Sequence, residues 1–406
     1  MPYILTSTLL FLLALDIIYW VHSQYHMDIV VTPAEVTAPA PLISICVPAR
    51  DEEKNIRRCV ESLLAQTYPN LEIIVLDDRS TDSTPQILDE LIMESDGLPS
   101  IQKHTLTNTR ASGFQNLRVL YGSDLPDGWA GKPHALFQAS ASARGEWLCF
   151  VDADTFAAPK AIASCYVKAL ETNADMFTIM TFQELGSFWE KVLMPLVMTA
   201  LSVGFSPRKV NDPKERVAVA NGQFILIKRS VYDALGGHEH IKDQIVEDKA
   251  LAEQVKWNGY RLVIADGFQM ARTRMYTSLP QMWEGWTKNI YLGLRDTPSM
   301  LLLGTFGALL SLIAALFLPI WPLLGFFWYL NGGGWMAISV IAKSLIVWGA
   351  LLWARANVSH ELGISKRYAL TVPLGAGLFA AIMLTSAWKV LSGKGVTWRG
   401  RVYRPK

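Results

Sequence analysis

The chain has 406 residues, of which 51% are apolar and 18% are charged, and its formal net charge at pH 7 is +1. A charge this close to zero gives no reason to expect a nucleic-acid-binding protein. The apolar share is high for a protein that is soluble throughout. The cysteines lack the spacing of a zinc site, so we expect buried, reduced thiols at Cys46, Cys59, Cys149 and Cys165.

The first long apolar run covers residues 3–21 and contains a single charge, Asp16. No basic segment precedes it and no small-residue cleavage site follows it, which favours a retained transmembrane helix over residues 1–22 rather than a cleaved signal peptide. Prolines among small residues then predict a linker over residues 23–42.

Strands and helices alternate in the next part of the chain. Residues 43–49 (ISICVPA) form an unbroken apolar run, as expected of a strand that is buried on both faces. After it the pattern predicts an amphipathic helix around 56–64, a strand at 72–77, a helix that begins near Thr84, a strand at 117–121, a helix at 132–143 and a strand at 147–151. This alternation predicts an α/β fold, Rossmann-like, with a mostly parallel sheet and helices on both faces.

Ligands of such sheets bind beyond the carboxyl ends of the strands, so the polar residues at these ends are the candidate site. They are Arg50-Asp51-Glu52 after the first strand, Asp77-Asp78 after the second, and Asp152 and Asp154 after residues 147–151. The dinucleotide motif GxGxxG does not follow the first strand, and GxxxxGK[ST] occurs nowhere in the chain. Nicotinamide cofactors and P-loop nucleotide chemistry are therefore disfavoured.

Asp152 and Asp154 lie two residues apart at the end of a strand, where both carboxylates can converge on one divalent cation. Oxygen ligands suit Mg²⁺ or Mn²⁺, which keep coordination positions open for substrate phosphates. Such a cation would neutralise a diphosphate leaving group. The alternative is that both residues only form the loop and cap a helix, but the acidic end of the second strand favours the metal site.

Short motifs that follow one another along the chain resemble those of the family 2 glycosyltransferases. They are PARDEE at 48–53, VLDDRS at 75–80, WAGK at 129–132, DAD at 152–154 and VED at 246–248. The resemblance covers about residues 43–290 and implies the A-type glycosyltransferase fold with a nucleoside-diphosphate-sugar donor.

The resemblance also implies a role for each matching residue. Around the donor, Pro48, Arg50 and Glu52 would line the base pocket, Asp78 would contact the base or ribose, Lys132 would lie near the base or diphosphate, and Asp152 would face ribose and metal. Asp154 would ligate the metal. A carboxylate such as Asp78 can accept hydrogen bonds from a base N–H or a sugar hydroxyl. Lys132 could instead be a solvated lysine at a helix start, although Gly131 before it allows close approach of a ligand.

Residues 217–227 resume a strand pattern, with Gly222 suggesting a close backbone approach. The helix that follows ends at Asn258-Gly259 and begins with Glu247 and Asp248, where carboxylates also stabilise the helix dipole. Transfer of a sugar to a hydroxyl needs a base that takes the proton. The resemblance implies that Asp248 is this base, in an inverting single displacement, with Glu247 beside it.

Residues 272–291 depart from the QxxRW pattern of the processive members of the family. Gln281 is followed by MWEGW, so the expected arginine is absent and polymer synthesis is disfavoured. With VTWRGR at 396–401, this variant resembles the carotenoid- and hopanoid-associated branch of the family. We expect the acceptor to contact Glu247, Gln281, Trp283 and Trp286.

Apolar runs at about 300–318, 334–353 and 368–388 predict further spans. Prolines at 319 and 322 and the glycines at 332–334 suggest broken segments, so the number of C-terminal spans is three or four. Residues 188–206 contain Glu190, Lys191 and Pro195 and are expected to form an interfacial or acceptor-covering helix, or otherwise a core helix. The basic residues of the tail after Lys389 and of the loop 354–367 favour a cytoplasmic position for both segments. A single span between them would place the two segments on opposite sides of the membrane, so both positions cannot be satisfied.

The sequence thus predicts a transmembrane helix (1–22), a linker (23–42), a cytoplasmic glycosyltransferase domain (43–298), C-terminal transmembrane helices (299–390) and a basic tail (391–406). We expect an integral cell-membrane enzyme, a hexosyltransferase that depends on Mg²⁺ or Mn²⁺. It would move a single sugar from a nucleoside diphosphate, with UDP favoured, to the hydroxyl of a carotenoid, isoprenoid or other lipid. The alternatives are a processive polysaccharide synthase and a non-catalytic membrane scaffold.

Overall fold

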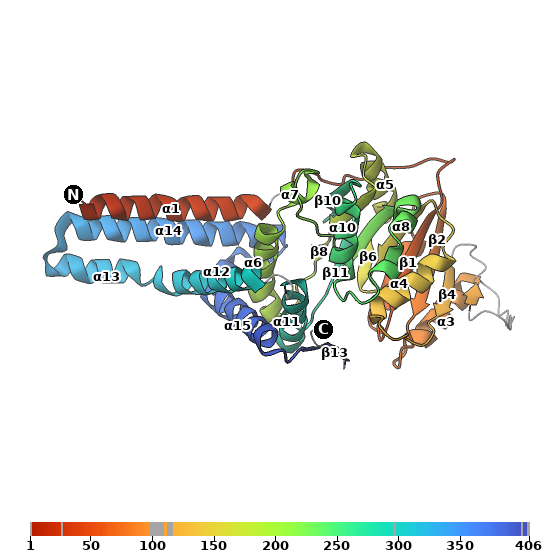
Figure 1. The fold of residues 1–406 in the computed structure, drawn as a ribbon. Helices are drawn as coiled ribbons and strands as arrows, with labels where there is room; N and C mark the ends of the chain where they lie inside the picture. Colours follow the sequence, from red (N-terminus) through yellow and green to blue (C-terminus); the bar gives the residue numbers. More distant parts are fainter. Residues whose placement is uncertain are drawn as a thin grey trace. The chain divides into compact units, whose positions relative to one another are not determined.

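The computed structural model describes residues 2–25, 27–96, 109–111, 117–294, 298–398 and 401–403. These residues divide into two compact units, which are described separately (Figure 1). The α/β unit consists of Met27–Glu184 and Pro207–Met275. The helical unit consists of Met1–His26, Leu185–Ser206 and Tyr276–Lys406. Part of the predicted basic tail, residues 399–400 and 404–406, lies outside the described residues.

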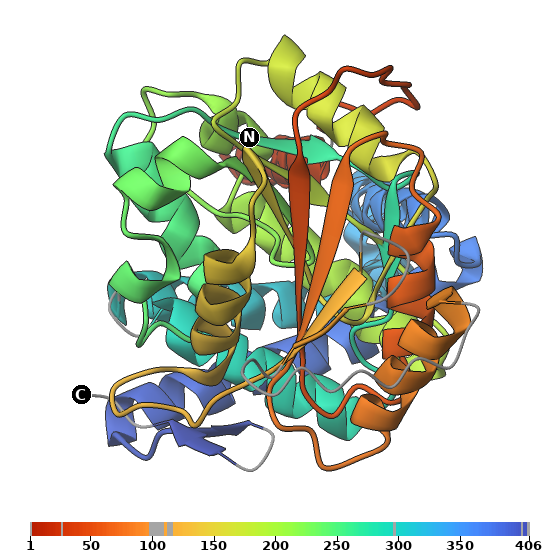
Figure 2. The ribbon, with the colours of Figure 1, turned by 90° about the vertical axis from the view of Figure 1, so that its right-hand side faces the viewer.

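An eight-stranded sheet in the order β10-β7-β9-β5-β1-β2-β4-β3 forms the centre of the α/β unit. Its strands are β1 (Ile43–Ala49), β2 (Leu71–Asp77), β3 (Thr109–Ala111), β4 (Leu117–Tyr121), β5 (Trp147–Val151), β7 (Met176–Met180), β9 (Phe224–Lys228) and β10 (Leu262–Asp266). β1 runs parallel to β2 and β5, β2 parallel to β4, and β7 parallel to β10, whereas β9 is antiparallel to both of its neighbours and β3 to β4. The predicted mostly parallel α/β fold is confirmed, and Figure 2 shows β1 and β2 side by side.

Both faces of the central strands are buried, which explains their continuous apolar sequences. In β2, Ile73 and Val75 belong to one hydrophobic core, and Ile74 and Leu76 belong to the core on the opposite face. The helices of this unit are α2 (Ile56–Leu64), α3 (Thr84–Asp96), α4 (Gly131–Ser142), α5 (Ala161–Glu171), α7 (Pro207–Asn211), α8 (Arg229–Ala234), α9 (Gly237–His240) and α10 (Glu247–Trp257). All four cysteines are buried and free, as expected from their spacing.

The sequence did not predict the small second sheet of the α/β unit. It has the order β6-β11-β8, from β6 (Thr155–Ala157), β8 (Phe182–Gln183) and β11 (Ala271–Thr273). These strands are too short to show a period. The strand expected over 217–227 is also shorter than predicted, because it begins only at Phe224, after a turn at Asn221–Gln223.

Residues 27–42, within the predicted linker, pack along the α/β unit. The Val31 N–H donates to the Asp266 carbonyl at 2.8 Å, and the Asp266 N–H donates to the Ile29 carbonyl at 2.8 Å. Further along, the Glu35 carboxylate pairs with Lys160 at 2.7 Å. Backbone pairing and an ion pair therefore hold this segment against the edge of the sheet at β10 and against α5.

The helical unit contains α1 (Pro2–Tyr25), α6 (Phe188–Gly204), α11 (Leu279–Leu294), α12 (Pro298–Phe317), α13 (Trp321–Trp328), α14 (Gly334–Glu361) and α15 (Val372–Ser392), followed by the hairpin β12 (Val396–Trp398) and β13 (Arg401–Tyr403). α14 packs against α1 and α13, and α12 against α15 (Figure 1). α6 crosses α15 closely, since a Cβ on Gly375 would lie 2.8 Å from the Val192 carbonyl oxygen.

Among the described residues, three stretches are long and apolar enough to cross a bilayer: Ser299–Phe317, Trp321–Glu361 and Lys366–Ser392. The second stretch reverses direction at Asn331–Gly334, where Gly332 and Gly334 have φ of 90° and 50°, so that α13 and α14 lie side by side. Large apolar side chains are exposed on these helices, among them Leu303 and Trp335. The length and surface of the helices indicate membrane association. α1 has a shorter apolar stretch, Thr8–Gln24.

Candidate active site

Lys132, Asp152 and Glu247 come from three elements of the α/β unit and meet in one cluster. The Lys132 Nζ lies 2.6 Å from Asp152 Oδ1 and 2.7 Å from Glu247 Oε1. Lys132 lies in the first turn of α4, Asp152 follows β5, and Glu247 is the first residue of α10. Burial alone would lower the pKa of Lys132, but the carboxylates of Asp152, Glu247 and Asp248 outweigh it and hold that pKa well above its usual value. The lysine is therefore a fixed positive charge between acidic groups.

Asp248 lies next to this cluster, in the first turn of α10. Its Oδ2 accepts a hydrogen bond from the Gly222 N–H at 3.0 Å, and its Oδ1 accepts one from the Lys249 N–H at 2.7 Å. Burial and the Glu247 carboxylate raise the pKa of Asp248 to about 6, while Lys132 opposes the shift. A carboxylate with this pKa is ionised at neutral pH and more basic than an exposed aspartate, which suits a general base.

Gly222 is required at its position because two functional side chains approach its backbone. A Cβ there would lie 3.1 Å from Asp248 Oδ2 and 3.1 Å from Lys132 Nζ. The turn that carries it is held in place by Asn221, whose side-chain amide donates to the Ile179 carbonyl at 2.9 Å. The close approach expected at Gly222 from the sequence is thus an approach to Asp248 and Lys132.

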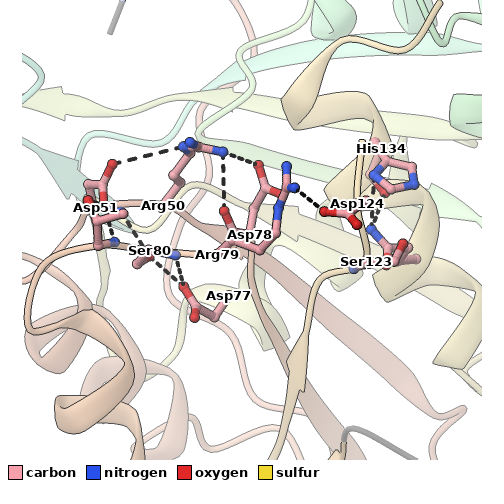
Figure 3. Close-up of polar contacts among 11 residues, drawn as sticks. Arg50, Asp51, Asp77, Asp78, Arg79, Ser80, Ser123, Asp124 and His134 are labelled. Carbon is pink, nitrogen blue, oxygen red and sulfur yellow. Dashed lines mark hydrogen bonds and ion pairs between the residues drawn. The ribbon is translucent and has the colours of Figure 1, made fainter. Parts of the chain in front are cut away.

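A second group of polar residues lies where β1 and β2 end (Figure 3). The Arg50 Nη1 lies 3.3 Å from Asp78 Oδ2 and donates to the Asp78 carbonyl, and the Asp78 N–H donates to the Ala49 carbonyl at 2.7 Å. Asp78 is buried, and its Oδ1 has no hydrogen bond within the described residues, only an ion pair with Arg79 Nε at 3.7 Å. This oxygen is available to a ligand N–H or hydroxyl.

The two loops after β1 and β2 are tied together. Asp51 and Arg79 have φ of 53° and 57°, a conformation that costs energy for residues other than glycine. The Asp51 N–H donates to Ser80 Oγ at 2.9 Å, and the Ser80 hydroxyl donates to Asp77 Oδ1 at 2.5 Å. Asp77 therefore stabilises the loop that follows β2. Arg79 belongs to the motif VLDDRS, but sequence reasoning assigned it no role.

Glu52 and Asp154 contribute further negative charge near Asp152. Both carboxylates, together with Asp152, add to the effect of burial in raising the pKa of Cys59. Glu52 also accepts a hydrogen bond from the Asn55 side chain at 2.9 Å. The Asp154 carbonyl accepts one from the Thr273 hydroxyl at 3.1 Å, which ties the DAD segment to β11.

The site residues at the ends of β1, β2 and β5 lie at one edge of the sheet, because these three strands are parallel. Pro48 lies within β1, half-buried, and pairs with Leu76. Within the described residues, no three His, Cys, Asp or Glu side chains group as a metal site would. The metal site that the sequence predicts has two protein ligands, Asp152 and Asp154.

Gln281, Trp283 and Trp286 lie on α11 of the helical unit. The Gln281 side chain is exposed and accepts hydrogen bonds from the Thr277 N–H and hydroxyl at 3.0 and 2.9 Å. Trp286 is buried against Tyr276, with ring centroids 6.1 Å apart, and Trp283 is half-buried. Of these three residues, only Gln281 and Trp283 therefore have accessible side-chain surface.

The model of the glycosyl transferase family 2 matches residues 44–236, from β1 to the end of α8. Among known proteins, the chain is 26% identical over 278 residues to the 4,4'-diaponeurosporenoate glycosyltransferase of Staphylococcus aureus, a match that covers 67% of this chain and 68% of the relative. The fold is shared with a mannosyltransferase of Pyrobaculum calidifontis solved in complex with GDP-Man and Mn²⁺. That structure has a TM-score of 0.52 and 17% identity over 95% of this chain and 97% of the other.

The family match, the order of the strands and the acidic edge of the sheet agree with one another. Residues 44–236 form a domain of glycosyltransferase family 2 with the A-type fold, and the chain is a glycosyltransferase.

Proposed function

We propose that this glycosyltransferase moves one sugar from a nucleoside diphosphate to the hydroxyl of a membrane lipid, with inversion at the anomeric carbon. The observation that carries the proposal is the cluster of Lys132, Asp152, Glu247 and Asp248. In it the Lys132 ammonium lies between Asp152, the candidate donor-side carboxylate, and Glu247, which adjoins the candidate base Asp248. A diphosphate needs positive charge, and an attacking hydroxyl needs a proton acceptor. The cluster offers both.

On the donor side, we assign the base and ribose to the loops after β1 and β2. The buried Asp78 Oδ1, which lacks a hydrogen bond in the described part of the chain, suits a base N–H or a ribose hydroxyl. Pro48 and Glu52 flank Arg50 in the sequence, and Arg50 holds Asp78 in place. We favour a UDP-sugar donor.

The donor set suits Mg²⁺ or Mn²⁺. Asp152 and Asp154 supply carboxylate oxygens, and these cations are commonly held by one or two carboxylates together with substrate phosphates. When bound, the cation would supply Lewis-acid stabilisation of the departing diphosphate. Asp152 is shared with Lys132, so the lysine and the cation would both act on the charge of the diphosphate.

We assign the base to Asp248. The Gly222 N–H and the Lys249 N–H orient its carboxylate. As the acceptor hydroxyl attacks the anomeric carbon, its proton passes to Asp248 and the diphosphate leaves from the opposite face. A single displacement of this kind inverts the configuration.

For the acceptor, we propose a lipid alcohol of the carotenoid or isoprenoid class. The support is the name of the Staphylococcus aureus relative and the long apolar helices of this chain. Glu247, Gln281, Trp283 and Trp286 are the proposed acceptor residues. We further propose that the protein is integral to the cell membrane, through α1 and the C-terminal helices, and that the α/β unit faces the cytoplasm, where nucleotide sugars are found.

The test uses purified protein in detergent with radiolabelled UDP-sugar or GDP-sugar, a lipid extract and Mn²⁺ or Mg²⁺, followed by phase partition. Label in the organic phase, in a species that carries one sugar, is the expected result. Label in a water-soluble polymer would indicate a polysaccharide synthase. Absence of both transfer and nucleotide release would indicate a non-catalytic scaffold.

A further inference from the structure

The segment Gly236-Gly237-His238 of the α/β unit is built around the side chain of Tyr232. Gly236 and Gly237 have φ of 75° and 51°. A Cβ on Gly237 would lie 2.5 Å from ring atoms of Tyr232, so no other residue fits there. His238 is 2% exposed, and its ring meets Phe150 edge-on with centroids 4.9 Å apart. The buried imidazole of His238 is thus in contact with the rings of Tyr232 and Phe150.

The Tyr232 hydroxyl has three polar neighbours. It lies 3.0 Å from Ser140 Oγ, 2.8 Å from His238 Nδ1 and 3.0 Å from the His238 backbone nitrogen, whose N–H it accepts. A tyrosine hydroxyl has one proton to donate and two lone pairs to accept. The Ser140 hydroxyl donates its own proton to the Phe137 carbonyl at 2.9 Å, so its oxygen can only accept from Tyr232.

These partners determine which atom donates in the remaining hydrogen bonds of Tyr232 and His238. Tyr232 donates to Ser140, and its oxygen accepts both the backbone N–H of His238 and a proton from Nδ1. The opposite arrangement, with Tyr232 donating to Nδ1, would place lone pairs of Tyr232 and Ser140 against each other in a buried site. Burial lowers the pKa of His238 to about 4, so the ring is neutral, and Nε2 carries a lone pair.

His238 lies among the elements that carry the charged cluster. α9, which contains His238, packs against α4, which carries Lys132, and against α10, which begins with Glu247. Phe150, its ring partner, precedes Asp152 by two residues. The charges of Glu247 and Lys132 both act on the imidazole. Within the described residues, Nε2 makes no hydrogen bond.

We propose that Tyr232 fixes His238 as the Nδ1–H tautomer, so that the Nε2 lone pair supports the Lys132 ammonium and makes His238 a positioning residue for the Lys132–Glu247 pair. An ammonium has three N–H donors, and Asp152 and Glu247 take two of them. An acceptor nitrogen suits the third, directly or through one water, whereas the other tautomer would direct an N–H at a cation. The functional part of this inference rests on the proposed transfer reaction.

The tautomer itself is tested by ¹⁵N NMR of histidine-labelled protein in detergent, with the His238 signals identified from their loss in His238→Gln. We expect a protonated Nδ1 and an unprotonated Nε2. In Ser140→Ala, Tyr232 loses its acceptor and can donate to Nδ1, so the signals should shift to the Nε2–H form. An Nε2–H tautomer in the unmodified protein would overturn the proposal. This readout needs no substrate, so it holds even if the proposed lipid transfer fails.

The positioning role is tested by comparing His238→Gln with His238→Asn. The amide of glutamine can reach the place of Nε2, whereas that of asparagine reaches only the place of Nδ1. We expect kcat for sugar transfer to stay within about 3-fold in His238→Gln and to fall by about 10-fold or more in His238→Asn, with the donor KM little changed in both. His240→Asn, on the exposed face of the same short helix, is the matched control.

A purely structural role predicts a different pattern. Both His238 variants would then lose activity in proportion to their loss of thermal stability, with no advantage for glutamine. Tyr232→Phe keeps the ring that Gly237 packs against and removes only the hydroxyl. We expect it to lower kcat with donor KM little changed; unchanged kcat in Tyr232→Phe would overturn the positioning role.

Discussion

At the scale of single residues, Asp152 and Asp154 have different surroundings although one residue separates them. Asp152 Oδ1 lies 2.6 Å from the Lys132 ammonium, whereas the Asp154 backbone is tied to β11 through Thr273. Asp152 therefore already has the Lys132 ammonium as a partner, which it would share with the proposed metal ion. Asp154 is the carboxylate whose replacement most directly tests the proposed metal site.

Asp154→Asn should abolish sugar transfer and leave the melting temperature within a few degrees of that of the unmodified protein, because asparagine has nearly the same size and keeps the backbone carbonyl that accepts the Thr273 hydrogen bond. Activity of the unmodified protein should disappear in excess chelator and return with Mn²⁺ or Mg²⁺. Asp212→Asn, at an exposed aspartate of the same unit, is the control. Full transfer in the presence of the chelator would contradict the metal assignment.

Asp248→Asn should lower transfer by roughly 10²-fold or more, because an amide cannot take the proton of the acceptor hydroxyl. Donor binding should persist. Since the pKa of Asp248 is raised to about 6, transfer by the unmodified enzyme should fall as the pH drops below about 6, and this limb should be lost in the variant. Kinetics from pH 5 to 8 measure both effects.

The same pKa shift predicts the stability of this variant. A raised carboxyl pKa in the folded state means that the protonated form is favoured, so the contribution of Asp248 to stability is lost as pH rises through about 6. Asparagine removes the charge that burial and the Glu247 carboxylate disfavour. The melting temperature of Asp248→Asn at pH 7 should therefore equal or exceed that of the unmodified protein, and a large decrease would mean that Asp248 is chiefly a structural helix cap.

At the scale of elements, the turn between residues 220 and 224 positions the charged side chains Asp248, at the start of α10, and Lys132, at the start of α4. Its backbone N–H at Gly222 holds Asp248, and its lack of a side chain makes room for Lys132. Gly222→Ala should lower kcat by up to about 10²-fold, as expected when reacting groups are displaced by a fraction of an ångström to one ångström. Gly204→Ala, where a Cβ would meet nothing within 4 Å, is the matched control.

α11 offers a second test at this scale. Trp286 is buried against Tyr276, so Trp286→Ala should destabilise the helical unit by about 3–5 kcal/mol, visible in thermal melts. Trp283 is half-buried, and Trp283→Ala should reduce transfer to lipid more than hydrolysis of the donor. Equal loss of both activities in Trp283→Ala would remove this residue from the acceptor site.

At the scale of the whole molecule, the apolar helices provide the argument for a membrane enzyme. Leu303 and Trp335 are 70% and 85% exposed on helices long enough to span a bilayer. Exposure of such large apolar side chains to water is unfavourable. The protein should sediment with membranes and resist extraction with alkaline carbonate. Inverted membrane vesicles should use added nucleotide sugar, and sealed right-side-out vesicles should not; the reverse result would place the α/β unit outside the cell.

Several elements were predictable because their signals are local. The strands at 43–49 and 147–151 are continuous apolar runs, since both faces of the sheet are covered. The position of Glu247 and Asp248 at a helix start followed from the Asn258-Gly259 stop and the helical spacing before it. The small sheet of β6, β8 and β11 was missed because two- and three-residue strands show no period and depend on pairing with distant segments.

The sequence by itself determined the fold class, the buried cysteines, the apolar helices and the candidate residues at the ends of β1, β2 and β5. The reason is that composition and the period of the hydrophobic residues indicate which faces of a helix or strand are buried. Only the tertiary structure decided the partners of these residues: Lys132 between Asp152 and Glu247, and Gly222 on Asp248. The contacts of Tyr232 with Ser140 and His238 were decided in the same way. The physical reason is that hydrogen bonds and ion pairs depend on distances of a few ångströms between atoms that the chain separates by tens of residues.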